Sequence, residues 1–298
     1  MTSHSLLLLA RVRAYIALTK PRIIELLLVT TLPTMILAAG RLPGLWLTLA
    51  TLVGGTFAAG SAEAINSYLD RDIDAVMHRT AHRPLVQAHI KPANALIFGI
   101  SLGLTAVAWL AFLVNVLSAV LALGAILFYV FVYTIWLKPR TSSNIVWGGA
   151  AGSFPVLIGW AAVTGSLSGP PIVLFLLIFF WTPPHYWPLA MKYREDYERA
   201  NIPMLPVVAT AGLVVKRIIQ YSWVMVIVSL ALIPIAKMGL IYSITAVVLG
   251  IAFLIEAYAL QSRVKKHEPT REMRLFHGSI SYLSLIFLAI AIDPLLRF

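Results

Sequence analysis

Long apolar runs separated by short polar stretches dominate the chain. The runs predict helices at about residues 22–40, 45–66, 93–113, 116–136, 146–164, 171–190, 221–236, 239–260 and 277–293. An apolar helix of roughly 20 residues is long enough to cross a lipid bilayer. The pattern therefore predicts an all-α polytopic membrane bundle of about nine transmembrane helices.

Two of the predicted breaks depend on few residues. Asn115 alone separates the third helix from the fourth, whereas Pro234, Lys237 and Gly239 separate the seventh from the eighth. Each break decides on which side of the membrane all later segments lie.

The amino-acid composition agrees with a membrane location. Hydrophobic residues make up 60% of the 298 residues and charged residues only 12%, against roughly 25% charged residues in a soluble domain. The chain has no cysteine, which excludes disulfides, zinc–thiolate and iron–sulfur sites and a thiol nucleophile.

Basic residues are concentrated on one side of the predicted bundle. Of the 23 lysine and arginine residues, only Arg41, Lys237 and Arg297 fall on the other side. The positive-inside rule then places the N-terminus in the cytoplasm, with residues 1–21 as a basic lead-in on the membrane surface, and the C-terminus outside. This orientation explains most of the net charge of +11, so we expect no nucleic-acid partner.

The stretch that follows the second predicted helix carries the clearest candidate chemistry. Asn66, Asp70 and Asp74 are spaced four residues apart, which places them on one face if the segment is helical; Asp72 falls off that face. Such an all-oxygen surface suits Mg²⁺, which is commonly bound by one or two carboxylates together with substrate phosphates.

Other charged residues extend this pattern. Arg79 and Arg83 follow the carboxylates at the same spacing and suit phosphate binding. A second acidic group, Glu195, Asp196 and Glu198, follows the sixth predicted helix on the same membrane side. The two groups lie four helices apart, which indicates a pseudo-repeat of helices 1–4 and 5–8, with helix 9 added, inside one bundle of residues 22–298.

The end of the sixth predicted helix contains a cluster of prolines around a histidine. Pro183, Pro184 and Pro188 predict a break in the helix. His185 lies near membrane depth, where an ionisable side chain indicates function, although hydrogen bonding within the bundle is the structural alternative.

Small residues follow Trp147 near the start of the fifth predicted helix, over residues 148–152. They indicate close helix packing, or alternatively a close approach of the backbone to a flat ligand.

Carboxylates and arginines at the mouth of an apolar bundle suit a diphosphate with an apolar tail. An isoprenoid diphosphate is such a molecule. A metal ion and cations would stabilise the diphosphate as it leaves, and a dry pocket would protect the resulting carbocation.

These motifs resemble the UbiA superfamily of intramembrane prenyltransferases. The resemblance runs from about residue 15 to the end of the chain. It is carried by Thr19–Arg22, Asn66–Pro84, Lys138–Arg140, Pro183–Trp187 and Asp196–Pro206. The Asn66–Pro84 motif marks the superfamily, whereas the fourth and fifth motifs mark its heme-modifying branch.

The resemblance implies a UbiA-type bundle in the bacterial cytoplasmic (inner) membrane, with its active site toward the cytoplasm. The implied reaction joins the farnesyl group of farnesyl diphosphate to a vinyl group of heme B, and water adds to give heme O. Mg²⁺ is the implied cofactor. The implied partners are farnesyl diphosphate, heme B and membrane lipid, with the downstream heme A synthase as a further candidate.

The resemblance also implies roles for single residues. One departure concerns the second acidic loop, where many superfamily members carry another aspartate four residues after the first. Here Asp196 is followed by Ala200 at that position, which leaves open whether Glu195 or Glu198 substitutes. The implied roles are catalysis for Asn66, Asp70, Asp74, Lys192 and Asp196, metal binding for Asn66, Asp70, Asp74 and Asp196, diphosphate binding for Arg79, Arg83, Lys138 and Arg140, and heme binding for His185.

Two other functions remain open at this point. A related prenyltransferase acting on an aromatic quinone precursor would share the first motif but would not need the Pro-Pro-His element. A transporter would fit broken helices and a repeat, but its coupling charges would lie at mid-membrane, whereas the acidic residues here gather at one face.

Overall fold

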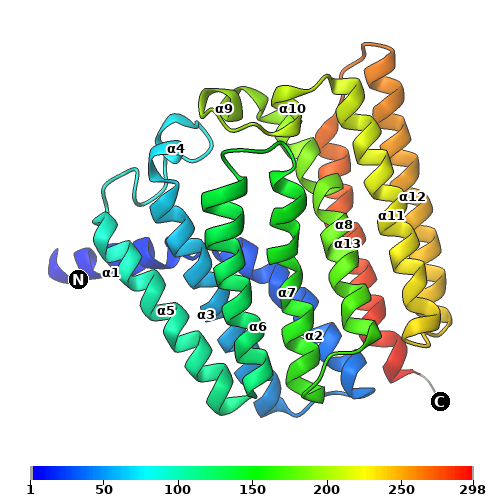
Figure 1. Cartoon of the computed structure of the whole chain (residues 1–298), viewed down its shortest axis with the longest axis horizontal. Helices are drawn as coiled ribbons and strands as arrows, with labels where there is room; N and C mark the ends of the chain where they lie inside the picture. Colours follow the sequence, from blue (N-terminus) through cyan, green and yellow to red (C-terminus); the bar gives the residue numbers. More distant parts are fainter. Residues whose placement is uncertain (1–2, 297–298) are drawn as a thin grey trace.

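The computed structural model describes residues 3–296; for residues 3–9, 22–23 and 25–28 only the backbone is described. Helices account for most of this part of the chain (Figure 1). They are α1 (Ser3–Leu18), α2 (Pro21–Ala39), α3 (Leu45–Leu69), α4 (Arg71–Val76), α5 (Pro92–Leu113), α6 (Val116–Leu127), the π-helix η1 (Phe128–Leu137), α7 (Asn144–Thr164), α8 (Gly169–Lys192), α9 (Arg194–Arg199), α10 (Leu205–Val208), α11 (Ala211–Ile235), α12 (Leu240–Lys265) and α13 (Glu272–Leu295).

The predicted all-α membrane bundle is confirmed. Within the described residues, eight helices have the length and apolar composition needed to cross a membrane, with α6 and η1 forming a single span. The first predicted span corresponds to α2. The long helices run side by side, and α4, α9 and α10 lie at one end (Figure 1).

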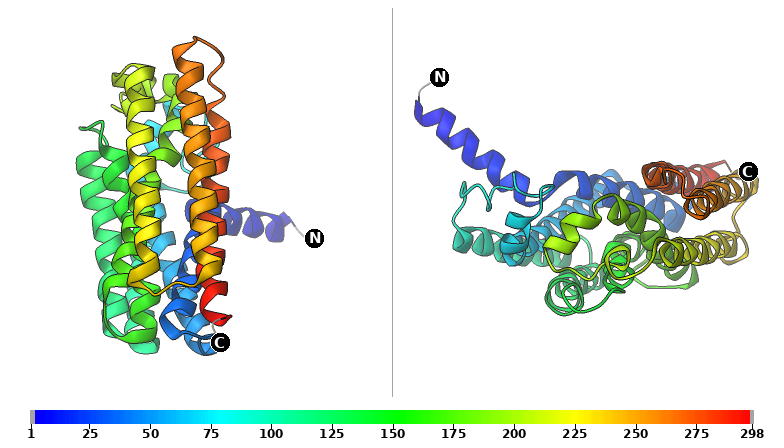
Figure 2. Two further views of the ribbon diagram at one scale, coloured as in Figure 1. Left: turned by 90° about the vertical axis from the view of Figure 1, so that its right-hand side faces the viewer. Right: turned by 90° about the horizontal axis from the view of Figure 1, so that it is seen from above.

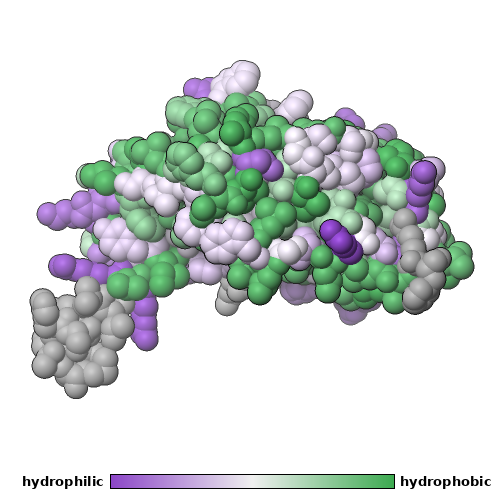
Figure 3. Space-filling view, turned by 90° about the horizontal axis from the view of Figure 1, so that it is seen from below, coloured by the Kyte–Doolittle hydropathy of each residue, from purple (hydrophilic) through white to green (hydrophobic). Residues whose placement is uncertain are grey.

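The two ends of the bundle differ in polarity. Seen from the end opposite α4 and α9, the surface is mostly hydrophobic or neutral, with scattered hydrophilic residues (Figure 3). Helix α1 extends sideways from the bundle (Figure 2), and its second half packs Ala14 and Leu18 against Ala64 and Ala95. The cytoplasmic location of the N-terminus and the pseudo-repeat stay predictions, and Arg297 lies outside the described residues.

The break at Asn115 is confirmed and has a clear cause. Asn115 caps the N-terminus of α6, since its side-chain oxygen accepts a hydrogen bond from the Ser118 N–H at 2.8 Å. Its Nδ2 donates to the Ala161 carbonyl of α7 at 2.8 Å. Asn115 therefore both ends one span and anchors the next.

The predicted start of the seventh span at residue 221 is wrong, because α11 already begins at Ala211. Lys216 and Arg217 fall between the predicted helices at 171–190 and 221–236. They are exposed on one face of α11, while Val214, Val215 and their neighbours one turn later are buried on the other. Helix α11 is thus amphipathic in its first turns and extends beyond its purely apolar part.

The predicted proline break in α8 is also wrong. Helix α8 continues from Gly169 to Lys192, and Pro183, Pro184 and Pro188 are buried inside it. Proline lacks the N–H that would bond to the carbonyl one turn earlier. Inside a bundle, neighbouring helices compensate for such losses, and α8 packs against α7, α11 and α13.

Glycines allow the closest helix approaches around α7. A Cβ on Gly159 would lie 2.9 Å from the Thr31 carbonyl oxygen of α2, whereas a Cβ on Gly152, two turns earlier, would meet no heavy atom within 4 Å. The contact at Gly159 is with backbone, which cannot move aside cheaply.

We therefore expect Gly159→Ala to lower the unfolding midpoint in detergent, at a cost of about 1–3 kcal/mol. Gly152→Ala, on the same helix, is the matched control and should not lower it, because alanine favours helix over glycine by up to about 1 kcal/mol. Equal unfolding midpoints for the two variants would contradict this account of α2–α7 packing.

Candidate active site

A cavity of about 300 Å³ lies between α2, α3, the α6–η1 span, α7 and α8. Polar residues line the part near α4, and apolar residues line the deeper part. The charged residues and one amide in the lining are Lys20, Glu63, Asn66, Asp70, Asp74, Arg79, Arg83 and Lys138. The apolar residues include Leu52, Ala58, Ile126, Phe154, Ile158 and Ile178. A mostly apolar pocket with a few converging polar groups is the usual form of a small-molecule site.

The junction between α3 and α4 holds the first motif on one face. Although α3 ends at Leu69, the helical hydrogen-bond pattern continues, from the Asp70 N–H to the Asn66 carbonyl at 2.9 Å and from the Asp74 N–H to the Asp70 carbonyl at 2.8 Å. Asn66, Asp70 and Asp74 are only 3–4% exposed, whereas the Asp72 side chain is 84% exposed. The predicted stacking is therefore present.

Asp70 and Asp74 are both paired with basic residues. Arg83 Nη1 lies 2.6 Å from Asp74 Oδ2, and Lys138 forms an ion pair with Asp70. Asn66 Nδ2 also donates to Asp70 Oδ2 at 2.7 Å. The cations assigned to phosphate are thus within reach of the carboxylates assigned to metal.

Arg79 completes this basic group from the loop after α4. Arg79 lies where the two acidic loops meet, and its Nη2 lies 3.5 Å from the Tyr197 hydroxyl. Within the described residues, its buried Nε has no hydrogen-bond partner. An unsatisfied buried donor beside the cavity is suited to an anionic ligand.

The π-helix η1 was not predicted. It continues α6 with hydrogen bonds to the fifth residue back, such as the Lys138 N–H to the Tyr133 carbonyl at 2.8 Å. The Thr134 hydroxyl donates to the Tyr129 carbonyl at 2.8 Å and accepts from Asn66 Nδ2 at 3.2 Å. The wider turn orients Tyr129, Tyr133 and Lys138 toward the cavity, as π-helical segments at functional sites often do.

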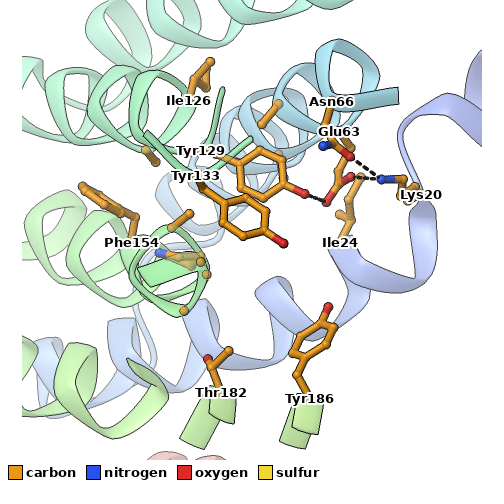
Figure 4. A pocket seen from close by; sticks show the side chains of 18 of the residues that line it. Lys20, Ile24, Glu63, Asn66, Ile126, Tyr129, Tyr133, Phe154, Thr182 and Tyr186 are labelled. Atoms are coloured by element: carbon orange, nitrogen blue, oxygen red, sulfur yellow. Dashed lines mark hydrogen bonds and ion pairs between the residues drawn. The ribbon is translucent and has the colours of Figure 1, made fainter. Parts of the chain in front are cut away.

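A third ion pair also lines the cavity, although it is not among the predicted site residues. Lys20 pairs with Glu63 and donates to Asn66 Oδ1 at 2.9 Å, while the Tyr129 hydroxyl donates to Glu63 Oε1 at 3.0 Å (Figure 4). A carboxylate inside an apolar helix is costly unless it is paired. That rule applied to Glu63 could have identified it.

Asp196 brings the second acidic loop to the first. Its Oδ2 accepts from the Arg79 N–H at 3.2 Å, and its Oδ1 pairs with Arg199. Burial of the Asp196 carboxyl raises its pKa, but these hydrogen bonds and one from the His78 N–H outweigh burial, so the pKa lies below its usual value. Asp196 itself does not line the cavity, although its neighbour Tyr197 does.

Three further predicted site residues lie away from the cavity lining. Lys192 is exposed at the end of α8. Arg140 is also exposed, and its Nη1 donates to the carbonyls of Ile135 at 2.8 Å and Trp136 at 3.0 Å, so it caps the end of η1. His185 is the third.

His185 is packed inside the bundle. Its ring stacks on Trp181 and on Phe276, with ring centroids 4.3 and 4.6 Å apart. Its Nδ1 lies 2.7 Å from Ser279 Oγ, and Ser279 Oγ donates to the Phe276 carbonyl at 2.6 Å. Because that hydroxyl proton is used, His185 donates through Nδ1 and its Nε2 keeps the lone pair.

The donor set of the first motif fits a hard divalent cation. Asp70 and Asp74 contribute carboxylate oxygens from one face, and Asn66 contributes an amide oxygen. The positive partners Lys138 and Arg83 show that these oxygens already compensate positive charge beside the cavity. Mg²⁺ with a diphosphate would meet the same oxygens and the same cations.

Comparison with known proteins identifies the class. Residues 27–280 match the UbiA prenyltransferase family. The fold resembles a digeranylgeranylglyceryl phosphate synthase, with a TM-score of 0.78 and 16% identity over 95% of this chain and 98% of that one. It also resembles a UbiA homologue from Archaeoglobus fulgidus bound to DMAPP and Mg²⁺, with a TM-score of 0.67 and 21% identity over 93% of this chain and 99% of that one.

The chain belongs to the UbiA prenyltransferase family. Within it, the chain is similar over almost its whole length to proteins named protoheme IX farnesyltransferase. It is 58% identical to the one from Clavibacter sepedonicus, over 97% of this chain and 94% of that one. It is 57% identical to the one from Streptomyces coelicolor, over 97% of this chain and 92% of that one.

The lowered pKa of Asp196 predicts a pH-dependent stability. A carboxyl with a lower pKa in the folded protein contributes stability above its unfolded pKa, about 3.9, and loses that contribution as the pH falls through the folded value. The unfolding midpoint should therefore fall more between about pH 5 and pH 3 in the wild type than in Asp196→Asn.

Glu198→Gln is the matched control, since Glu198 is exposed on the same short helix. It should keep the wild-type pH profile. If Asp196→Asn keeps that profile as well, the hydrogen bonds of Asp196 do not stabilise the contact between the two loops.

Proposed function

We infer that this chain transfers the farnesyl group of farnesyl diphosphate to a vinyl group of heme B, giving heme O and diphosphate. The observation that carries this inference is an apolar cavity whose mouth is formed by buried Asp70 and Asp74 and by Arg79, Arg83 and Lys138. This arrangement accommodates an apolar chain and a diphosphate at once. The similarity to protoheme IX farnesyltransferases supports heme B as the acceptor.

We propose Mg²⁺ as the divalent metal, held by Asn66, Asp70 and Asp74, with Asp196 contributing from the second loop. When bound, Mg²⁺ would neutralise charge that develops on the leaving diphosphate. Asp196 can take part only if it exchanges its bonds to Arg199 and the Arg79 N–H.

The basic residues are proposed to hold the diphosphate. Lys138 and Arg83 would turn from Asp70 and Asp74 to phosphate oxygens as the ligand enters, since both side chains already lie at the cavity wall. Arg79 contributes its unsatisfied Nε. Lys192 and Arg140 remain proposed contributors at the same end, although neither lines the cavity.

The cavity wall suits an allylic cation. Tyr129, Tyr133, Trp181 and Tyr186 line it, and aromatic faces attract positive charge. As the bond from farnesyl C1 to the diphosphate oxygen breaks, C1 bonds to the terminal vinyl carbon of heme B. Water then adds to the other vinyl carbon and releases a proton, which completes the hydroxyethylfarnesyl group.

The location in the cell is likewise proposed. The excess of basic residues at the α4 end supports a cytoplasmic active site in the bacterial inner membrane. Heme A synthase, which would consume heme O, is the proposed downstream partner.

Asp70→Asn and Asp74→Asn should each lower turnover at least about 100-fold, because a single removed electrostatic stabiliser commonly costs that much. Asp72→Asn is the matched control, since Asp72 is exposed on the opposite face, and should stay near wild type. The assay is mass spectrometry of heme products from heme B and labelled farnesyl diphosphate with Mg²⁺.

Replacing heme B with a hydroxybenzoate tests the quinone-precursor alternative, and prenylation of that compound alone would overturn the proposed function.

His185 is proposed to contact heme B through Nε2. His185→Ala should then weaken heme B binding and change the Soret band. Farnesyl diphosphate binding should survive, because Asp70, Asp74, Arg83 and Lys138 lie on other segments. Ser279→Ala is a useful companion, since it removes the bond to Nδ1 and leaves the ring in place. Normal heme binding with a lowered unfolding midpoint in His185→Ala would assign His185 to packing alone.

A further inference from the structure

Two glycines on facing walls of the cavity have no packing role. A Cβ on Gly55 of α3 or on Gly152 of α7 would meet no heavy atom within 4 Å, and both residues line the cavity. Neighbouring glycines differ. A Cβ would lie 2.6 Å from Leu110 at Gly54 and 2.8 Å from Thr182 at Gly149. Gly54 and Gly149 are needed for helix contacts, whereas Gly55 and Gly152 leave space inside the cavity.

The presence of glycine at these two positions needs an explanation, because a glycine inside a helix lowers stability by roughly 0.5–1 kcal/mol relative to alanine. No neighbouring helix uses the space that the missing side chains leave. What the glycines preserve is cavity volume.

The two glycines lie at different depths. A helix rises 1.5 Å per residue, so Gly55 lies about 16 Å along α3 from Asn66. Asn144 begins α7 at the end nearest the carboxylates, and Gly152 lies about 12 Å along α7 from it. Between Glu63 and Gly55, the cavity-lining residues of α3 are small, namely Ala62, Ala59, Ala58 and Thr56.

Larger residues line the cavity beyond this depth. Deeper in the cavity, Leu52 lies about one turn beyond Gly55 on α3, and Ile158 lies almost two turns beyond Gly152 on α7. The open part of the α3 wall therefore extends from the carboxylates to Gly55, a length similar to that of three extended isoprene units.

We propose that Gly55 and Gly152 determine the length of prenyl chain that the cavity accepts. Gly55 leaves room for the third isoprene unit of a farnesyl chain whose diphosphate lies at the carboxylates. Gly152 leaves room for the middle of the chain. This inference rests on the proposed function for the position of the diphosphate.

The test compares Gly55→Leu and Gly152→Leu with the wild type, using geranyl, farnesyl and geranylgeranyl diphosphate with heme B. Gly55→Leu should lower kcat/KM for farnesyl diphosphate about 10-fold or more, since rejecting a small apolar group is worth about 10–200-fold. The same variant should keep kcat/KM for geranyl diphosphate near its wild-type value. Gly152→Leu, which narrows the cavity closer to the carboxylates, should lower kcat/KM for all three donors.

Gly278→Leu is the matched control. Gly278 also lies inside a helix with no heavy atom near its Cβ, but it is exposed on α13 and does not line the cavity. It should keep the wild-type order of donors. If Gly55→Leu does not fold, the series Gly55→Ala and Gly55→Val should shift the donor preference in steps.

An unchanged ratio of farnesyl to geranyl kcat/KM in a folded Gly55→Leu protein would overturn the inference. Binding of a non-reacting farnesyl thiodiphosphate separates this failure from failure of the proposed function. If the wild type prenylates no heme, the proposed function fails. The length inference then still requires Gly55→Leu to bind the farnesyl analogue at least about 10-fold more weakly than the wild type, and the geranyl analogue equally well. Equal farnesyl binding would overturn it.

Discussion

Buried carboxylates inside an apolar bundle are the constraint on which the site depends. Asp70, Asp74 and Glu63 are nearly inaccessible, and a buried charge left without a partner costs roughly 3–5 kcal/mol. Their partners Lys138, Arg83 and Lys20 come from the end of η1, the loop after α4 and the residue before α2. Charge pairing therefore fastens three separate segments around one end of α3, and the cavity mouth is what these segments enclose.

The same ion pairs are contacts that a charged ligand would replace. The proposed diphosphate and divalent cation together carry both kinds of charge that the pairs contain, so they would replace each contact without leaving a buried charge alone. The hydrophobic walls have a different basis. Close helix contacts at Gly54, Gly149 and Gly159 set the spacing of α2, α3, α5, α7 and α8, whereas Gly55 and Gly152 leave the interior open. Glycine therefore allows close helix packing at some positions and leaves cavity space at others.

Local patterns in the sequence were sufficient for much of this protein. The apolar runs predicted the spans, because a helix that crosses a bilayer must be apolar over nearly its whole length. Asn115 ended a helix because its side chain caps the next one. Asn66, Asp70 and Asp74 shared a face because helical geometry relates residues four apart. The motifs also indicated the UbiA family, to which the chain belongs.

Tertiary structure alone decided the partners of these groups and the shape of the cavity. Lys138 pairs with Asp70 across 68 residues, and Asp196 accepts from Arg79 across 117, and no periodicity specifies pairs so distant. Neighbouring helices kept α8 continuous through three prolines, and η1 formed as a π-helix where local sequence predicted an ordinary one. Arg140 turned to the carbonyls of η1, and His185 was enclosed by aromatic rings. Sequence determined which residues could share a helix face; only packing between helices decided which of those faces meet.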